Sequence, residues 1–342
     1  MTTKTTTGSQ AVAREPVVEV RGLNLKNESI ANSEHESPLQ SPSSMGNGSV
    51  VALKVDVDTY AGTRDGVPRL LDIMERAGIK GTFYFSMGPD NSGKAIRRIF
   101  TRKGFLQKML RTGAPGVYGI RTMLYGTLLP APQIASSFPE VLRETAARGH
   151  ETGVHCWDHV RWHDYLPRMT MGEVAAELAR AAGLYQRIMG ESPKTTAAPG
   201  WTVSAASLEL QDSMHLDYSS DGRGYAPFYP VFAGKRCATL QLPSTWPTMD
   251  EILGTDGIDV HNINDFYFSR LKDGLNVHTI HAEMEGGVMA DCFIELLGRL
   301  QGAGARFVTL GEAARAYRET APDATLAMGE LPGRAGLVAI QG

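Results

Sequence analysis

From residue 50 onward, short apolar runs alternate with amphipathic segments, and this alternation most constrains the fold. VVALKVDVD predicts a buried strand, TRDGVPRLLDIMERAG a helix, and GTFYFS a second buried strand. Capping-box patterns predict the starts of two later helices, at Thr170 with Glu173 and at Thr309 with Glu312. The remaining predicted elements are a helix at FPEVLRETAARGH and strands at ETGVH, KTTAAP, LDYSSD, ATLQLP and VHTIHAEM.

Strands that alternate with helices predict a parallel sheet, and about seven such units favour a barrel over an open sheet. In barrels the chemistry gathers at the carboxyl ends of the strands. Residues 1–48 are rich in Ser, Thr, Asn and Gly and predict a disordered tail, although Met45 offers an alternative translation start. We therefore expect one α/β domain at 49–320, with an insertion at about 91–135 and a C-terminal extension at 321–342.

Composition excludes several classes of protein. A net charge of -3 implies no overall affinity for nucleic acid. Cys156, Cys237 and Cys292 are odd in number and lack CxxC spacing, so we expect reduced thiols in the cytoplasm. The sequence shows neither the apolar core of a signal peptide nor an apolar run long enough for a membrane-spanning helix.

Two histidines follow the predicted strand ETGV. His155 and His159 are four residues apart, and on one helical turn that spacing points both imidazoles the same way. Such a pair can hold one metal ion. The alternative is a pair of surface or capping histidines.

Two aspartates at the end of the first strand complete a candidate metal site. If Asp58 joins the histidines, two nitrogens and one carboxylate leave a coordination position open for water, as in catalytic zinc sites. Asp56 is then placed to act as a general base. The alternative for the two aspartates alone is a capping or calcium-type pair.

A late predicted strand supplies a candidate general acid. His281 in VHTIHAEMEG could protonate a leaving amine, and Glu283 and Glu285 could orient it or contact a polar substrate. Taken alone, His281 could equally be a satisfied core histidine.

These motifs together resemble the NodB-homology polysaccharide deacetylases of carbohydrate esterase family 4, over about residues 50–320. The resemblance implies an irregular (β/α)7 barrel and a divalent metal, zinc in the first place, with cobalt, nickel or manganese as alternatives. It assigns Asp56 as base, His281 as acid, and Asp58, His155 and His159 as metal ligands.

The chain departs from the family pattern at two places. Val57 separates two aspartates that are usually adjacent, and AAPGW places Ala197 where the family has an arginine that pairs with the base. Our hypothesis is that Arg223 in SSDGRG, beside Asp221, supplies the lost charge; the alternative is a surface turn. Trp157 and Trp201 are candidate walls of a pocket for a formyl group, or else part of the core.

A closer resemblance is to one lipid-directed branch of the family. DVDTYAGTRDGVPRLLDIMERAGIKGTFYFSMGPDNSGK, HCWDHVRWH, AAPGW, SSDGRG and VHTIHAEMEG together resemble that branch. The resemblance implies removal of formate from 4-deoxy-4-formamido-L-arabinose carried on undecaprenyl phosphate. The product would serve lipid A modification and polymyxin resistance.

A basic segment independently suggests a lipid partner. Residues 91–139 carry eight basic residues and no Asp or Glu, and apolar residues are interleaved with them. We expect residues 94–111 to contact an anionic membrane surface, at the inner face of the inner membrane. The alternative is a solvated basic helix that packs its apolar side on the barrel.

Three rival functions remain open. One is deacetylation of another N-acylated aminosugar, such as peptidoglycan or a chitooligosaccharide. A second is an aspartate-nucleophile phosphatase, which Tyr60 disfavours because that motif needs Thr or Val there. The third is a non-catalytic carbohydrate- or lipid-binding barrel, suggested by the missing arginine.

Overall fold

The computed structural model describes residues 1, 48–97, 121–332, 334 and 336–342. The chain divides into two units, Met1–Gln40 and Ser41–Gly342, and the second holds every described helix and strand. The predicted tail at 1–48 lies almost wholly outside the described residues. So does most of the segment 94–111 for which we predicted membrane contact.

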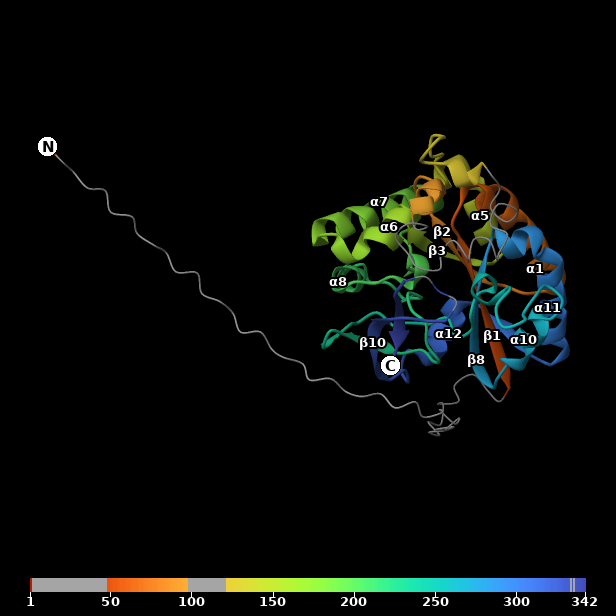
Figure 1. The fold of residues 1–342 in the computed structure, drawn as a ribbon. Helices are drawn as coiled ribbons and strands as arrows, with labels where there is room; N and C mark the ends of the chain where they lie inside the picture. Colours follow the sequence, from red (N-terminus) through yellow and green to blue (C-terminus); the bar gives the residue numbers. More distant parts are fainter. Residues whose placement is uncertain (2–47, 98–120, 333, 335) are drawn as a thin grey trace. The chain divides into compact units, whose positions relative to one another are not determined.

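A parallel sheet of seven strands forms the centre of the second unit (Figure 1). Its order is β5-β4-β3-β2-β1-β8, and β9 also pairs with β1. All of these pairings are parallel. The strands are β1 (Ser49–Val57), β2 (Thr82–Ser86), β3 (Glu151–Cys156), β4 (Thr195–Thr196), β5 (Tyr218–Ser219), β8 (Gly274–His281) and β9 (Arg306–Val308).

An irregular segment joins the two edges of this sheet. The amide of Ser219 in β5 donates to the carbonyl of Leu240 at 2.8 Å, and the amide of Thr245 donates to the carbonyl of Val277 in β8 at 3.0 Å. The predicted strand ATLQLP lies here, but it forms only isolated bridges, since Pro243 has no amide to donate. The fold is therefore the irregular α/β barrel that the sequence predicted.

The outer face of the sheet is covered by helices, and its side chains form the largest apolar cluster. Val51, Leu53, Val55 and Val57 of β1 are all buried in it. Figure 1 shows β1 and β8 side by side with α1, α10 and α11 next to them. The α-helices that contribute to this cluster are α1 (Val67–Ala77), α5 (Pro139–Ala147), α7 (Met171–Met189), α9 (Met249–Ile252), α10 (Ile263–Ser269) and α11 (Ala290–Gly302).

Two helices begin at the predicted caps, the long α7 and the short last helix, α12 (Leu310–Tyr317). The Thr170 hydroxyl accepts from the amide of Glu173 at the start of α7, and Thr309 with Glu312 forms the same capping box at the last helix. The remaining described α-helices are short, and they are α6 (His159–Tyr165) and α8 (Ala205–Ser213). The single-turn helices are η1 (Gly62–Gly66), η2 (Ser92–Arg97), η3 (Thr122–Leu124), η4 (Ala135–Ser137), η5 (Leu166–Arg168), η6 (Pro199–Trp201) and η7 (Met284–Val288).

Residues 321–342 contribute to a second, smaller sheet. Its order is β11-β10-β6-β7, with β6 (Tyr229–Phe232), β7 (Lys235–Arg236), β10 (Asp323–Gly329) and β11 (Val338–Gln341). The amide of Arg223 donates to the carbonyl of Ala339, and the amide of Gln341 donates to the carbonyl of Arg223, both at 2.8 Å. The C-terminal strand is thereby fixed to the loop that follows β5.

All three cysteines are free, as expected for reduced thiols. Within the described ranges, none of the helices combines the length and the apolar character needed to cross a bilayer.

Candidate active site

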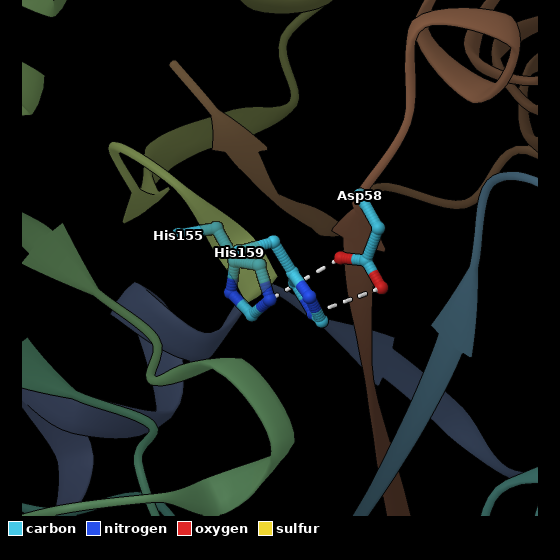
Figure 2. A group of neighbouring side chains, drawn as sticks. All are labelled: Asp58, His155 and His159. Carbon is cyan, nitrogen blue, oxygen red and sulfur yellow. Dashed lines mark ion pairs between the residues drawn. The ribbon is translucent and has the colours of Figure 1, made fainter. Parts of the chain in front are cut away.

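Three predicted metal ligands meet at the carboxyl ends of neighbouring strands. Asp58 follows β1, His155 lies near the end of β3, and His159 is the first residue of α6. The Nε2 atoms of His155 and His159 lie 3.2 and 3.3 Å from Oδ1 and Oδ2 of Asp58, respectively. Figure 2 shows both imidazoles turned toward this carboxylate. One ligand atom from each residue lies within 4.8 Å of the others. Two imidazole nitrogens and one carboxylate oxygen suit a divalent cation such as zinc, so these residues can hold one metal ion.

The two histidines converge for a different reason from the one we expected. They do not share a helical turn, because β3 continues to Cys156 and α6 begins at His159. Asp158 caps α6 by accepting from the amide of Arg161 at 3.0 Å. The turn between strand and helix therefore brings the two imidazoles together, and our helical-spacing argument was wrong.

The electrostatics of Asp58 favour its anionic form. Burial works against the charge, but His159 and His155 outweigh it and lower the pKa of Asp58 below its ordinary value. Asp58 is therefore a carboxylate in the neutral pH range, as a metal ligand must be.

Glu283 holds the loop that presents Asp58. Its Oε1 accepts from the amide of Asp58 at 3.0 Å, and from the amide and hydroxyl of Thr59, both at 2.7 Å. A side chain at Gly62 would overlap this carboxylate and force it to move away from the Asp58 loop. Burial and the charge of Asp58 raise the pKa of Glu283 to about 7. Glu283 thus orients the loop of a predicted metal ligand.

Of the two glutamates predicted to orient His281, Glu285 makes a hydrogen bond to that residue. Glu285 accepts from the amide of His281 through Oε2 at 2.8 Å. Burial raises the pKa of Glu285 to about 7. Glu283 therefore holds the loop that carries Asp58, and Glu285 holds the end of β8.

Asp56 and His281 lie opposite each other on neighbouring strands. They are register partners in the β1 and β8 pair, so their side chains leave the sheet on the same face. Within the described part of the chain, Asp56 Oδ1 and His281 Nδ1 are buried and have no hydrogen-bond partner. A carboxylate oxygen and an imidazole nitrogen are thus available to accept or donate a proton.

Several carboxylates act on the charge of His281. Burial lowers its pKa, but Asp250, Asp58, Glu285 and Asp56 together outweigh burial and raise the pKa above the ordinary histidine value. His281 therefore retains its proton to a higher pH than a free histidine.

Lys54 provides the positive charge beside Asp56, and our sequence analysis missed it. Its Nζ donates to Asp56 Oδ2 at 2.9 Å, and the side chain is fully buried. The signal was present in KVDVD, since residues two apart on a strand share a face. Lys54 alternates with the valines in the same way as Asp56 and Asp58, and this spacing predicts the Lys54–Asp56 ion pair.

The hypothesis that Arg223 supplies the charge beside Asp56 is wrong. The Arg223 guanidinium donates to both carboxylate oxygens of Glu251, at 2.7 and 2.8 Å, and to the carbonyl of Trp246 at 3.1 Å. Its neighbour Asp221 is fully buried, where it accepts from Gln241 Nε2 at 3.0 Å. Both residues belong to internal networks rather than to a surface turn.

The two tryptophans differ in their surroundings. Trp201 is buried and its indole donates to Ser244 Oγ at 3.0 Å, with Lys54 Nζ 5.4 Å from its ring centre. The guanidinium groups of Arg223 and Arg334 also lie over its ring, at 4.8 and 4.7 Å. Trp157 is partly buried and packs against Arg180. Trp201 thus supports the Lys54–Asp56 pair, and a role of either residue as a pocket wall stays a prediction.

A family model and two similar proteins agree on the family of this chain. The chain matches the polysaccharide deacetylase family over residues 44–219. It is 40% identical over 263 residues to a Shewanella sediminis protein named "Probable 4-deoxy-4-formamido-L-arabinose-phosphoundecaprenol deformylase ArnD", covering 77% of this chain and 85% of that protein. It is 31% identical over 283 residues to a Wigglesworthia glossinidia brevipalpis protein of the same name, covering 82% of this chain and 98% of that protein.

A solved structure agrees in fold. A Mycobacterium smegmatis protein assigned to the polysaccharide deacetylases superposes with a TM-score of 0.56 at 18% identity, covering 83% of this chain and 96% of that one. The sequence match, the two relatives and the barrel point the same way. This chain belongs to the polysaccharide deacetylase family.

Proposed function

We propose that this chain is a metal-dependent deformylase of undecaprenyl-phosphate-linked 4-deoxy-4-formamido-L-arabinose. The observation that carries the proposal is the Asp58, His155 and His159 cluster beside Asp56 and His281. The names of the two relatives support the formamide as the bond that is cleaved. Formate and the free amine would be the products, and the amine would serve lipid A modification and polymyxin resistance.

Asp58, His155 and His159 would hold the metal, and zinc suits this donor set best, with cobalt, nickel or manganese as alternatives. A divalent cation bound there supplies Lewis acidity toward a carbonyl oxygen and makes water easier to deprotonate. Glu283 keeps Asp58 in place through its three hydrogen bonds to the Asp58–Thr59 loop.

Asp56 would act as the general base. Its Oδ2 is held by Lys54, which leaves Oδ1 to accept a proton from the attacking water. The new bond joins the water oxygen to the formyl carbon. Lys54 thus takes the place that the family gives to an arginine.

His281 would act as the general acid. As the carbon–nitrogen bond breaks, its imidazolium donates a proton to the leaving sugar amine. The carboxylates around His281 raise its pKa, which keeps the acid form populated near neutral pH. Glu285 fixes the backbone at this position.

The lipid-linked substrate also implies a place of action. We infer that the chain works at the cytoplasmic face of the inner membrane and contacts the anionic surface through residues 94–111. The support is the excess of basic residues interleaved with apolar ones in that segment.

A second candidate is deacetylation of another N-acylated aminosugar, which the match to the polysaccharide deacetylase family favours. The test is incubation of the purified chain with the formamido-arabinose lipid and with its acetamido counterpart, each with and without chelator. We expect formate from the first substrate, little acetate from the second, and no product with chelator. Faster acetate release would favour the second candidate. Absence of any product from a metal-loaded enzyme would favour the non-catalytic barrel.

A further inference from the structure

A cavity of about 350 Å³ lies next to the loop that carries Asp58. Its described lining contains two arginines, two tyrosines and three apolar residues, and none of these is acidic. The lining residues are Tyr60, Arg64, Arg121, Tyr125, Leu129, Pro130 and Pro132. This combination differs from the carboxylate-rich site beside it.

Tyr60 connects the cavity to the metal site. It follows Asp58 by two residues, and its amide donates to Asp90 Oδ2 at 2.9 Å. Its ring packs against Tyr125, with ring centres 6.4 Å apart, and against Phe138 at 4.7 Å. One short loop therefore supplies both a predicted metal ligand and a wall of the cavity.

The opposite wall is tied to the same region by backbone hydrogen bonds. The amide of Asp90 donates to the carbonyl of Pro132 at 2.8 Å, and the amide of Gly93 donates to the carbonyl of Tyr125 at 2.9 Å. Asp90 thus binds the Tyr60 side and the Pro132 side of the cavity at once. The cavity is built by contacts that also fix its position relative to Asp58.

The two guanidinium groups give the cavity the chemistry of an anion site. Arg121 is exposed, and Arg64 pairs with its neighbour Asp65 through Nε at 2.8 Å and one terminal nitrogen at 2.6 Å. Both members of that pair are more than half exposed, so it is weak and leaves further N–H groups of Arg64 for a ligand. Guanidinium groups recognise phosphate oxygens by paired hydrogen bonds, and phenol hydroxyls add donors.

We propose that this cavity binds the phosphodiester of the lipid-linked sugar, with Arg64 and Arg121 as its specificity-determining residues. The inference rests on the proposed function, because that substrate carries the formamide and the phosphate on one sugar ring. An anion site must then lie about one sugar ring away from the metal ligands. Tyr60, two residues after Asp58, lines this cavity, which places the cavity beside the loop that carries Asp58. Leu129, Pro130 and Pro132 would contact the first part of the isoprenoid chain.

A binding experiment tests the site without relying on turnover. Farnesyl phosphate, farnesol and inorganic phosphate are titrated against the full-length wild-type chain and the double variant R64Q/R121Q. We expect farnesyl phosphate to bind the wild type best and to lose about tenfold to a hundredfold in affinity in the double variant. The matched control is R76Q, which removes an exposed arginine near the end of α1, outside the cavity lining, and should bind as the wild type does.

Two further comparisons sharpen the binding experiment. D65N removes the carboxylate beside Arg64 and should strengthen farnesyl phosphate binding. Inorganic phosphate that binds as well as farnesyl phosphate would overturn the lipid-linked assignment. If R76Q and R64Q/R121Q lose the same affinity for farnesyl phosphate, the proposal that this cavity binds the phosphate is wrong.

A kinetic experiment separates this inference from the proposed function. The ratio of kcat/KM for the phosphate-linked formamido sugar to that for its phosphate-free methyl glycoside should fall about tenfold to a hundredfold in R64Q/R121Q and stay as in the wild type in R76Q. An unchanged ratio in the double variant would overturn the phosphate site while leaving deformylation intact. If neither sugar yields formate, the proposed function fails and the farnesyl phosphate titration alone decides the site.

Discussion

Alternate residues of strand β1 point to opposite faces of the sheet, and the two faces differ in composition and in role. On the outer face, Leu53 and Val55 are buried in the apolar cluster beneath the helices. On the inner face, Lys54 and Asp56 form a buried ion pair, and Asp56 lies opposite His281 of β8. Because a strand alternates its side chains, one short sequence provides both packing and chemistry.

The inner face also changes along its own length. Its first residues, Val50 and Ala52, join an apolar cluster with Val277 and residues of α12, and the charged residues come later. A buried ion pair costs desolvation that its attraction offsets only in part. The charges at the carboxyl end of β1 are therefore better explained by chemistry than by stability.

The largest effect should follow from removal of a predicted metal ligand. H155A should lose bound metal and formate release together, because only two of the three protein ligands remain. Metal analysis of the purified protein and a formate assay measure both. H261A is the matched control, since His261 is exposed and outside the cluster. Full metal content in H155A would contradict the assignment.

A substitution that leaves a void in the apolar cluster on the outer face of β1 should lower stability rather than activity. L53A should lower the free energy of unfolding by about 2–5 kcal/mol, because it removes a fully buried side chain from a packed cluster. Urea denaturation measures this loss. The folded variant should keep its metal and its kcat, and a hundredfold loss of kcat would break the division between the two faces.

Loss of the positive charge beside Asp56, the proposed base, should give a smaller effect on turnover. K54M should lower kcat by about tenfold to a hundredfold, since Asp56 loses the group that fixes one of its oxygens. Metal content should stay as in the wild type, which distinguishes this positioning role from that of a ligand. K54R should recover part of the rate. A K54M enzyme with normal kcat would show that Asp56 needs no such partner.

The smallest effect should be a shift in pH dependence. As the proposed general acid, His281 must be protonated to act, so activity should fall as the pH rises through its pKa, which neighbouring carboxylates raise. E285Q removes one of these charges and keeps an acceptor for the His281 amide. The alkaline limb of the kcat/KM profile should therefore move to lower pH, by less than about one unit. A shift to higher pH would contradict the electrostatic account.

Local patterns predicted much of this molecule. The capping boxes at Thr170 and Thr309 and the buried strands β1 and β2 depend on neighbouring residues, so the sequence indicated them correctly. The convergence of Asp58 with His155 and His159 followed from the rule that parallel strands end at one edge of a sheet.

The features that the sequence did not predict depend on contacts between residues far apart in the chain. The partner of Arg223 depends on how Glu251 and the C-terminal strand β11 pack around it, and no local pattern reports that arrangement. The segment ATLQLP closes the barrel between β5 and β8 without a regular strand, which periodicity cannot indicate. Lys54 is different, because its phase with Asp56 was readable in the sequence.

The central claim is that two aspartates two residues apart have separate roles, Asp58 as a metal ligand and Asp56 as the base. The most direct test measures metal content and formate release on the same preparation of D56N, with the formamido-arabinose lipid as substrate. The account predicts metal at the wild-type level with formate release lowered by at least about a hundredfold. Near-normal formate release, or a protein that has lost its metal, would contradict it.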